Sequence, residues 1–475
     1  MKYKNVLCLY PYFRETSAAL GFFPPTGLEY VATALEGYVD EITLIDLRQE
    51  REYHNIDDLR NFIKKKIDLM CVSVNWSYYF KDVCNLINYL PDDIKLIVGG
   101  QHATDHVEDL FQKCPNIDII VRGEGEETIQ QIAQDVDLQD ILGISYKNNG
   151  RIIHNQNRPL PPVDNLRHPN RRLRRTSYYI KSKGVNLSNT EFDSVLTARG
   201  CPYKCKFCTF NINPLGQKRN YSARTPESVV EEIKSLDAGV IFFSDDNFFT
   251  NFKRSERLCD LIIEQGINKK FIAQARLEIF KSPAMLRKAE KAGLKIMLIG
   301  IESPNDRVLK QLDKGFTSKD IREAFKVLRN YAFYYHCYFI YGNIGESKEE
   351  MLYIPLFAKE IGADSISFMR LQVRKFSPLK EIIEKTPGYY LSPGGFVYSD
   401  RYSIDDLRRI KKDIKRAFYT PYQLYKIIRK LFRIRFITLV DIFVFIPRFP
   451  VLLYRLIARE IEKKRKKRKK SHNKK

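Results

Sequence analysis

Residues 201–208 read Cys-Pro-Tyr-Lys-Cys-Lys-Phe-Cys and place three thiols within eight residues. Four thiolates normally saturate a [4Fe-4S] cluster, so Cys201, Cys205 and Cys208 would leave one iron open for a small molecule. A zinc loop is the competing interpretation. Zinc ligands usually come as two pairs, however, and no cysteine or histidine follows Cys208 within 30 residues. The stretch therefore predicts an iron–sulfur cluster with one reactive iron.

The chain that follows alternates short apolar runs with amphipathic stretches of helix length. Apolar runs of this length, punctuated by glycine, are typical of parallel strands buried on both faces. They predict an α/β fold with a partial (β/α)6 barrel over residues 191–375. The six expected strands are Ser194–Thr197, Val240–Phe243, Phe271–Ala275, Lys295–Ile299, Tyr338–Tyr341 and Ser365–Met369.

Polar residues follow four of these strands at the point where each strand ends. In barrels of this kind the chemistry lies at the C-terminal ends of the strands. Any one of these residues alone could be a helix cap or a turn, but four strand ends in register with the cysteine loop indicate a ligand site. The candidates are Asp245, Asp246, Arg276, Glu302, Ser303, Gly342 and Asn343.

The spacing C-x3-C-x2-C, with Phe207 before the last cysteine, resembles the signature of the radical S-adenosylmethionine (radical SAM) superfamily. The resemblance implies that AdoMet chelates the open iron of a [4Fe-4S] cluster and is cleaved to a 5′-deoxyadenosyl radical. It also implies AdoMet contacts: Asp245 and Asp246 for the amino group, Arg276 for the carboxylate, Glu302 and Ser303 for ribose and methionine, and Gly342 and Asn343 for adenine, with Phe207 in the cluster loop. One departure is that Asp-Asp-Asn replaces the family's Gly-Gly-Glu.

Residues 1–140 form a second α/β unit with the pattern of a Rossmann-like doubly wound sheet. Expected strands are Asn5–Leu9, Ile42–Ile45, Leu69–Val74, Lys95–Val98 and Asp118–Val121, and expected helices are Gly27–Leu35, Asp57–Lys65 and Tyr79–Leu90. Such sheets bind ligands beyond the carboxyl ends of their strands. A dinucleotide is disfavoured, because Tyr-Pro-Tyr-Phe-Arg at 10–14 stands where a G-x-G-x-x-G turn would be.

The loops of this unit resemble those of the cobalamin-binding domain that precedes many radical SAM barrels. The resemblance implies cobalamin contacts from Ser73, Val74, Asn75, Gly99, Gly100, His102, Gly123, Glu124, Gly125 and Glu126. Domains that ligate cobalt carry D-x-H-x-x-G after the first strand, whereas here no histidine precedes His54. Cobalamin is therefore expected in the base-off form without a histidine ligand, and His102 and His106 are expected to be loop or cap residues.

Between the two units, residues 141–190 are expected to form a hairpin and a linker. Asn149-Gly150 is a strong signal for a type I′ hairpin turn, and a proline- and arginine-rich stretch runs from Arg158 to Arg175. Its arginines either grip phosphates of a ligand or lie in a solvated linker. They are Arg171, Arg172, Arg174 and Arg175.

Positive charge is concentrated at the C-terminus. Residues 401–475 hold 25 Lys or Arg against 6 Asp or Glu, while the whole chain carries +23. Residues 376–462 are expected to be helical and amphipathic, and 463–475 to be a polybasic tail that begins with eight consecutive cations. The apolar stretch from Phe432 is too broken for a membrane-spanning helix. Attachment to an anionic membrane surface, cover for the barrel with a disordered tail, and nucleic-acid binding remain as alternatives.

These features together predict a cobalamin-dependent radical SAM enzyme that methylates an unactivated carbon of a hydrophobic or lipid-like substrate. By resemblance the relatives include hopanoid C-methylases and the anaerobic magnesium-protoporphyrin IX monomethyl ester cyclase. A flavodoxin or ferredoxin is expected as electron donor. The scattered remaining cysteines and the lack of a secretory signal predict a cytoplasmic protein, peripheral to the membrane if the tail attaches. Candidates facing the substrate are His336, Tyr338, Tyr341 and Arg370, all of which could equally be packing residues.

Two alternative activities use the same barrel. A ring-forming or oxidative cyclase of tetrapyrrole or lipid type would share both cofactors, because the cofactors perform the hard step and the protein positions them. An RNA-modifying radical SAM enzyme would use the basic tail. Nucleic acid is disfavoured, since neither an additional amino-terminal cysteine pattern nor an aromatic stacking platform is visible.

Overall fold

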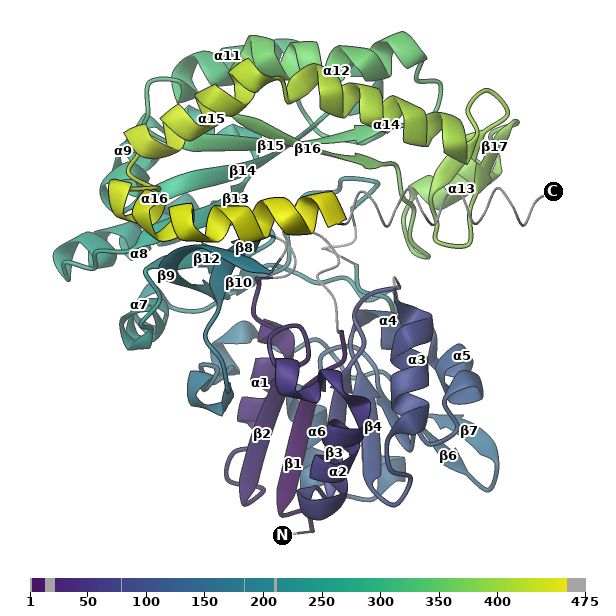
Figure 1. Ribbon diagram of the computed structural model, residues 1–475. Coiled ribbons are helices and arrows are strands. Elements are labelled where there is room, and N and C mark those ends of the chain that lie inside the picture. Colours follow the sequence, from purple (N-terminus) through teal and green to yellow (C-terminus); the bar gives the residue numbers. More distant parts are fainter. Residues whose placement is uncertain (1, 13–21, 78, 183, 209–211, 459–475) are drawn as a thin grey trace.

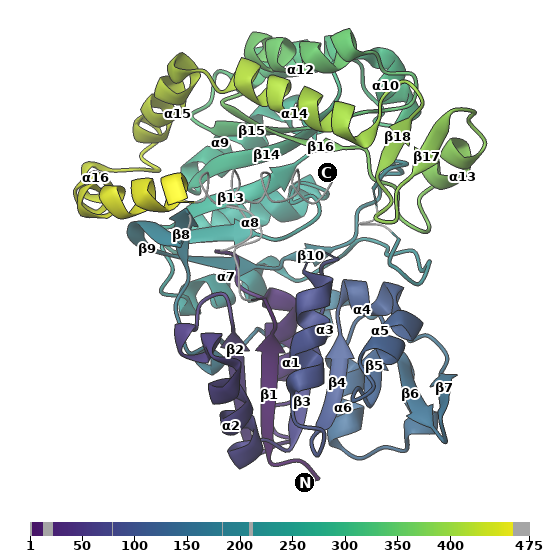
Figure 2. The same cartoon turned by 45° about the vertical axis from the view of Figure 1, so that its right-hand side comes forward.

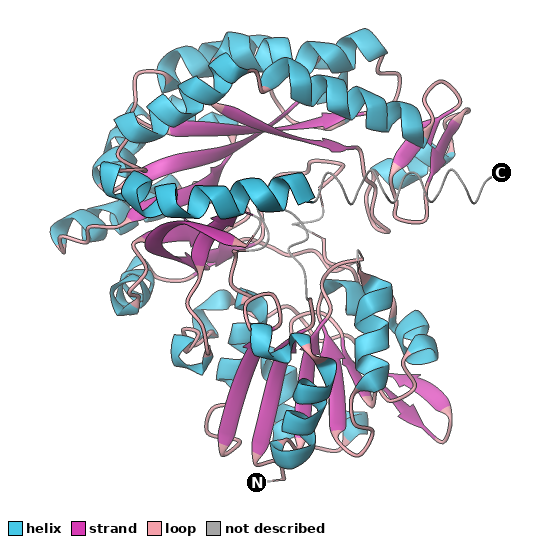
Figure 3. Cartoon of the chain, in the orientation of Figure 1, coloured by secondary structure: helices cyan, strands magenta, loops and turns pink. Residues whose placement is uncertain are grey.

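The computed structural model describes residues 2–12, 22–77, 79–182, 184–208 and 212–458, which form two α/β domains and a helical C-terminal region (Figure 1). The predicted polybasic tail at 463–475 lies outside the described residues. Figure 3 shows the barrel sheet above the N-terminal sheet, with the barrel strands running across the view and the N-terminal strands running toward the barrel.

A seven-stranded sheet forms the N-terminal domain, in the order β2-β1-β3-β4-β5-β6-β7. β1 to β5 pair in parallel, which is the doubly wound arrangement that the apolar runs predict. The strands are β1 Asn5–Tyr10, β2 Glu41–Asp46, β3 Leu69–Ser73, β4 Lys95–Gly99, β5 Ile119–Val121, β6 Ile144–Asn148 and β7 Arg151–His154. The helices are α1 Thr26–Ala34, α2 Ile56–Lys66, α3 Phe80–Tyr89, α4 Gln101–Asp105, α5 Val107–Lys113 and α6 Glu126–Ala133.

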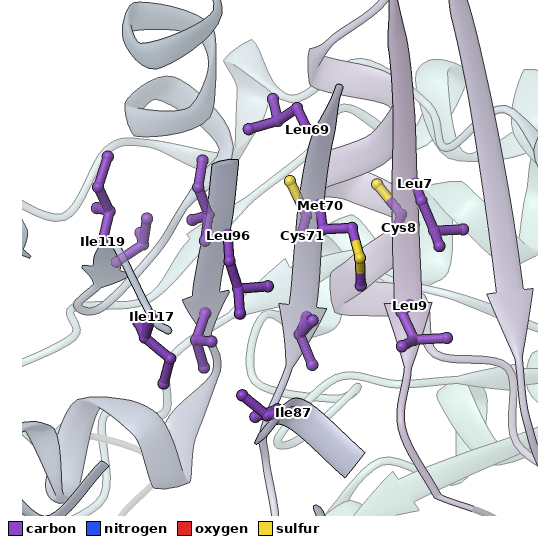
Figure 4. Close-up of a cluster of buried hydrophobic side chains, with 14 of the residues drawn as sticks. Leu7, Cys8, Leu9, Leu69, Met70, Cys71, Ile87, Leu96, Ile117 and Ile119 are labelled. Atoms are coloured by element: carbon purple, nitrogen blue, oxygen red, sulfur yellow. The ribbon is translucent and has the colours of Figure 1, made fainter. Parts of the chain in front are cut away.

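Figure 4 shows the core of this domain, where β1, β3 and β4 contribute fully buried aliphatic side chains such as Leu9, Leu69 and Leu96. Cys8 and Cys71 are register partners on β1 and β3 and are both buried. These two thiols are packing residues, as their scattered positions in the sequence predict.

The predicted hairpin forms, but it belongs to the N-terminal sheet and not to a linker. Asn149 and Gly150 have φ values of 47° and 75°, which a type I′ turn requires. β6 pairs antiparallel with β5, so the first sheet extends to His154 instead of ending near residue 140. The sequence shows the turn, whereas the partner of the hairpin depends on tertiary structure.

The second sheet curls into a half-barrel in the order β16-β15-β14-β13-β12-β9-β8. All its strands are parallel except β8, which pairs antiparallel with β9 at one edge. The strands are β8 Tyr179–Ser182, β9 Val185–Val195, β12 Val240–Phe243, β13 Lys270–Ala275, β14 Leu294–Glu302, β15 Tyr334–Tyr341 and β16 Ser365–Arg370. β10 Ala198–Arg199 and β11 Ser222–Ala223 form a separate short antiparallel pair.

The first barrel strand lies earlier than predicted. The expected run was Ser194–Thr197, whereas β9 ends at Val195 and extends back to Val185. The first half of β9 pairs with β8 at the edge of the sheet and is only partly buried. Its residues are therefore largely polar, and no apolar run marks this part of the strand in the sequence.

Outer helices cover one face of this sheet. They are α7 Pro226–Ser235, α8 Phe252–Glu264, α9 Pro283–Lys291, α10 Asp306–Gln311, α11 Ser318–Leu328 and α12 Lys348–Ile361. Because side chains alternate along a strand, Ile241 and Phe243 pack beneath the helices while Val240 and Phe242 face the concave side. The apolar part of the concave face also includes Phe192, Ile272 and Leu298, and Phe22, Phe23 and Phe436 pack against it from outside the sheet.

The C-terminal region continues past the barrel with α13 Leu379–Glu384, β17 Tyr389–Leu391, β18 Val397–Ser399, α14 Ile404–Phe418, α15 Pro421–Arg433 and α16 Leu439–Phe445, and residues 449–458 are helical. The hydroxyl of Tyr419 accepts from the Ile366 N–H at 3.1 Å and donates to the Ile366 carbonyl at 2.5 Å, which satisfies both backbone polar groups of this residue on the outer edge of β16. Within the described residues, no helix has the length and apolar character needed to span a bilayer.

Candidate functional site

The three cysteines lie in a loop that several contacts with the barrel hold in place. Gly200 precedes the loop with φ +86°, and a Cβ there would meet the Asn220 carbonyl at 2.6 Å, so a side chain is excluded. The Lys206 N–H donates to the Leu312 carbonyl at 3.0 Å, and the Ser377 hydroxyl donates to the Lys206 carbonyl at 2.6 Å. The loop is therefore anchored to the segments after β14 and β16.

The donor set fits an iron–sulfur cluster better than a single ion. In the described part of the chain no three His, Cys, Asp or Glu side chains converge on one metal position. A cubane binds each thiolate through a different iron, so its ligands need not converge. Arg276 donates from Nη1 to Cys205 Sγ at 3.2 Å and its guanidinium covers the Tyr203 ring at 3.7 Å. The Arg276 guanidinium is therefore placed to stabilise the negative charge of the cysteine thiolates.

The two carboxylates after β12 have different surroundings. Asp245 is buried and accepts from the Thr197 N–H at 2.7 Å, the Ala198 N–H at 3.0 Å and the Thr197 hydroxyl, so its oxygens hold the loop that leads to the cysteines. Asp246 accepts from the Gly200 N–H at 2.9 Å and lines a cavity. Burial raises the pKa of Asp246 to about 7. Asp246 is thus the carboxylate that a ligand can reach.

The side chains of Glu302 and Ser303, at the end of β14, are bonded to neighbouring residues. Glu302 has a φ of +70° and forms a buried ion pair with Lys314 at 3.2 Å. The Ser303 hydroxyl accepts from the Asn305 N–H at 3.1 Å, and Ser303 is fully buried. Both side chains thus shape the end of β14.

The loop after β15 is organised by Glu346, which the sequence did not single out as a ligand. Its Oε2 accepts from the N–H groups of Gly342 at 2.7 Å and Asn343 at 2.9 Å, and from the Asn343 side chain at 3.1 Å. Glu346 Oε1 and Asn343 Oδ1 are buried without a hydrogen-bond partner. Burial raises the pKa of Glu346 to about 7.

The four predicted substrate-facing residues separate into two groups. His336 and Tyr338 lie on the side of β15 opposite the outer helices, and His336 bonds through Nδ1 to Ser365 at 2.6 Å and through Nε2 to Ser367 at 2.9 Å. Burial lowers the pKa of His336 to about 4. Tyr341 instead packs in the core beneath the outer helices, and Arg370 lies 4.6 Å from the Phe396 ring centroid.

One cavity of about 390 Å³ joins the two domains. Eight of the predicted cobalamin residues line it: Ser73, Asn75, Gly99, Gly100, Gly123, Glu124, Gly125 and Glu126. Gly100 has φ +105°, and a Cβ would lie 2.6 Å from Asn75 Oδ1, so the backbone must stay bare there. From the barrel side, Gly200 and Asp246 complete the wall. The cavity therefore extends from the N-terminal sheet to the cysteine loop.

Two predicted cobalamin residues do not line this cavity. Val74 is fully buried, and its carbonyl accepts from the N–H groups of His102 and Ala103. The His102 ring packs edge-on against Phe80 at 4.6 Å, and burial lowers its pKa to about 4. No histidine is among the described residues that line the cavity.

Arginines that the sequence did not single out join the cavity loop to the cysteine loop. Arg199 pairs with Glu124 at 2.8 Å and Glu126 at 2.6 Å, and Arg219 pairs with Glu124 at 3.1 Å. Arg199 stands two residues before Cys201. Its place next to the cysteine loop is the only feature of the sequence that could have singled out Arg199.

Two arginines of the predicted linker cluster contradict both readings offered for them. Arg174 pairs bidentately with Glu29 of α1, at 2.6 and 2.8 Å, and with Asp193 of β9, at 2.8 and 2.9 Å. Arg171 pairs with Glu232 of α7 at 2.6 Å. Arg174 therefore connects the two domains and Arg171 ties the linker to the barrel, so both are structural, while Arg172 is exposed.

Comparisons with known proteins agree with this architecture. Residues 195–355 match the radical SAM superfamily, and residues 16–133 match the B12-binding domain. An uncharacterized methyltransferase of Pyrococcus horikoshii is 30% identical over 357 residues, which are 73% of this chain and 75% of that protein. The chain belongs to the radical SAM enzymes that carry a B12-binding domain.

More distant relatives have named activities. The anaerobic magnesium-protoporphyrin IX monomethyl ester cyclase of Synechocystis is 29% identical over 52% of this chain and 50% of its own length. The hopanoid C-3 methylase of Methylococcus capsulatus is 25% identical over 69% of this chain and 62% of its own length. The chain thus spans half to three fifths of these two proteins. Its fold matches the radical S-adenosylmethionine methyltransferase TsrM of Kitasatospora setae, with a TM-score of 0.69, 18% identity and coverage of 88% and 91% of the two chains.

Proposed function

We propose that this enzyme transfers a methyl group to an unactivated carbon of a hydrophobic or lipid-like substrate. The observation that carries the proposal is the cavity that reaches from the glycine-rich loops of the B12-binding domain to Gly200, next to Cys201. A methyl carrier and a radical source would there lie against one another. Cobalamin bound there would supply a transferable methyl group, and AdoMet bound to the cluster would supply the radical chemistry that activates a carbon–hydrogen bond.

The residues of this chain would bind and orient the cofactors. Cys201, Cys205 and Cys208 would hold the cluster, and Asp246 with the backbone of the Gly342 loop would orient AdoMet. The glycine loops at Gly99–Gly100 and Gly123–Gly125 would take cobalamin, in the base-off form and without a protein ligand to cobalt. The absence of histidine from the described cavity wall supports this last point.

The substrate class follows from the concave face of the barrel. Phe242, Ile272 and Leu298 make one part of it apolar, and His336 with its two serine partners makes a polar group on β15 and β16. A largely apolar molecule with one polar group fits such a surface. An acidic electron carrier, flavodoxin or ferredoxin, would approach near Lys204, which is exposed in the cysteine loop. We place the enzyme in the cytoplasm.

Anaerobic incubation with AdoMet, reductant, methylcobalamin and a lipid extract of the host tests the activity. A methylase yields a product heavier by one methylene group, whereas the alternative, a cyclase or oxidase, yields a product that has lost hydrogen or gained oxygen. The cyclase stays the second candidate because of the relative named above.

The cluster assignment is tested separately by substitution. Cys201→Ala, Cys205→Ala and Cys208→Ala should each abolish iron binding and the release of 5′-deoxyadenosine. Cys259→Ala is the matched control, since this thiol is buried in the outer core of the barrel, and it should keep both properties. Normal cleavage of AdoMet by the Cys205 variant would refute the assignment.

A further inference from the structure

Exposed apolar side chains are concentrated on the C-terminal helices. Of the 22 large hydrophobic residues that are exposed in the described chain, 14 lie between Tyr422 and Ile457. Leu439, Phe443 and Ile446 are 69%, 72% and 58% exposed. Their spacing of four and three residues places them on one face of the helix. Single exposed apolar residues are ordinary, but a group of this size marks an interaction surface.

The charge around these residues is almost entirely positive. Residues 421–458 contain seven Lys or Arg and one acidic residue, Asp441. Asp441 caps its own helix, because its carboxylate accepts from the Thr438 N–H at 2.8 Å. Lys426, Arg429 and Arg433 are exposed on α15. An occupant of this surface must therefore be apolar and carry negative charge.

Exposed tyrosines add a third property. Tyr422, Tyr425 and Tyr454 are 66%, 58% and 72% exposed. Their rings are apolar with one polar end, which is the character enriched at the boundary between a bilayer and water. Figures 1 and 2 show α15 and α16 toward the side of the barrel away from α13. The segment after α16 is held on β9 by the bond from Arg448 to Asn189 at 2.8 Å, while the side chains named above remain exposed.

We infer that α15, α16 and residues 449–458 form a surface that docks on an anionic lipid bilayer. Helices of this composition lie in the plane of the interface and do not cross it. A second copy of the chain is a poorer occupant, because a symmetric contact would set the same cations against each other. Lipid phosphates would pair with the Lys and Arg side chains, and acyl chains would contact the exposed apolar side chains.

The surface is continuous with the apolar part of the barrel. Phe436 connects α15 to α16 and packs in the cluster with Phe192 and Phe242 on the concave face. Its carbonyl accepts from Lys270 Nζ at 3.0 Å, which ties this connection to β13. The docking surface thus specifies the substrate of the proposed function, on which this step rests. The substrate is a lipid that the enzyme takes from the bilayer.

Sedimentation of the full-length enzyme with vesicles tests the docking surface. The lipids are phosphatidylcholine alone and an equimolar mixture with phosphatidylglycerol. We expect the enzyme to pellet with the mixture and at least tenfold less with phosphatidylcholine. The triple variant Leu439→Gln, Phe443→Gln, Ile446→Gln should lower the partition coefficient at least tenfold. Leu356→Gln on α12 is the control, since Leu356 is also 58% exposed, and it should have no effect.

A charge variant separates the two contributions. Lys426→Gln, Arg429→Gln, Arg433→Gln should reduce the preference for phosphatidylglycerol without changing binding to phosphatidylcholine, and added salt should reduce the same preference through screening. Equal partition of the wild type and the apolar triple variant would overturn the inference. So would a lipid-free dimer, seen by sedimentation velocity, that the triple variant converts to a monomer, because the occupant would then be a second copy.

Docking and catalysis fail independently in this design. Vesicle binding is measured without AdoMet or reductant, and all variants should cleave AdoMet like the wild type, because none of the altered residues lies at the cysteine loop or the cavity. Normal docking with no AdoMet cleavage would refute the proposed function alone. Normal cleavage without docking would refute the membrane surface alone.

Discussion

Replacing Arg174 by methionine should destabilise the junction between the two domains. The guanidinium makes four hydrogen bonds to the carboxylates of Glu29 and Asp193, whose side chains are 1% and 6% exposed. Arg171 Nε remains 3.6 Å from Asp193 in the variant, whereas Glu29 would keep no bonded cation. Breaking a buried pair from one side costs about 3–5 kcal/mol, because an uncompensated charge stays in the interior.

Urea unfolding, followed by circular dichroism and by tryptophan fluorescence, measures this loss. The chain has one tryptophan, Trp76, in the N-terminal domain, so fluorescence reports that domain while circular dichroism reports both. We expect an earlier midpoint for Arg174→Met, and the two signals should separate because the domains no longer unfold together. Arg172→Met is the control, since Arg172 is exposed.

The double variant Glu29→Gln, Arg174→Met makes the test specific. Removing the stranded charge should restore part of the lost stability, which a general packing defect would not allow. A loss below about 1 kcal/mol for Arg174→Met, within the range of an exposed ion pair, would refute the reasoning. A double variant less stable than Arg174→Met would also refute it.

Two further predictions concern the ligand loops. Gly100→Ala should abolish cobalamin binding, followed by the visible spectrum, because its Cβ would meet Asn75 Oδ1 at 2.6 Å; Gly150→Asn, at an open hairpin turn, should bind normally, and intact binding by Gly100→Ala would contradict the assignment of this loop. Burial raises the pKa of Glu346 to about 7 from 4.5, so its contribution to stability is present below pH 4.5 and is lost as the pH rises through 7. Glu346→Gln should therefore flatten the decline of the unfolding free energy across this range, and an unchanged decline in urea titrations would show that another group causes it.

The sequence predicts well what short-range pattern controls. Parallel strands buried on both faces leave continuous apolar runs, so β1, β12 and β16 lie within one residue of their expected bounds. The turn at Asn149-Gly150 is equally local. β9 shows the limit, since its first half is a partly exposed antiparallel edge with an irregular polar pattern.

Pairing over long distances could not be read from the sequence. Glu124 and Glu126 were predicted from their loop as cobalamin residues, and they do line the cavity, but their ion pairs with Arg199 require the relative placement of two domains. Glu29 was not predicted at all, because an isolated glutamate on a helix gives no sign of an arginine 145 residues away. Buried charges of this kind become visible only in the folded chain.

The hydroxyl of Tyr419 bears on how the barrel sheet avoids pairing with other chains. An open parallel sheet has two outer strands, and an outer strand with free N–H and carbonyl groups is a template for aggregation. On one side the outermost strand is β8, which has only four residues, and a short edge strand is a poor template. On the other side Tyr419 occupies both polar groups of Ile366, and the Gln423 side chain donates to the Asp364 carbonyl at 2.8 Å. A fragment trimmed to residues 195–355 would lose β16 together with Tyr419 and Gln423. β15 would then be an edge strand with exposed backbone N–H and carbonyl groups, which could pair with strands of other chains. Tyr419 and Gln423, which lie beyond the barrel, thus shield this part of the outer edge of the sheet from pairing with other chains.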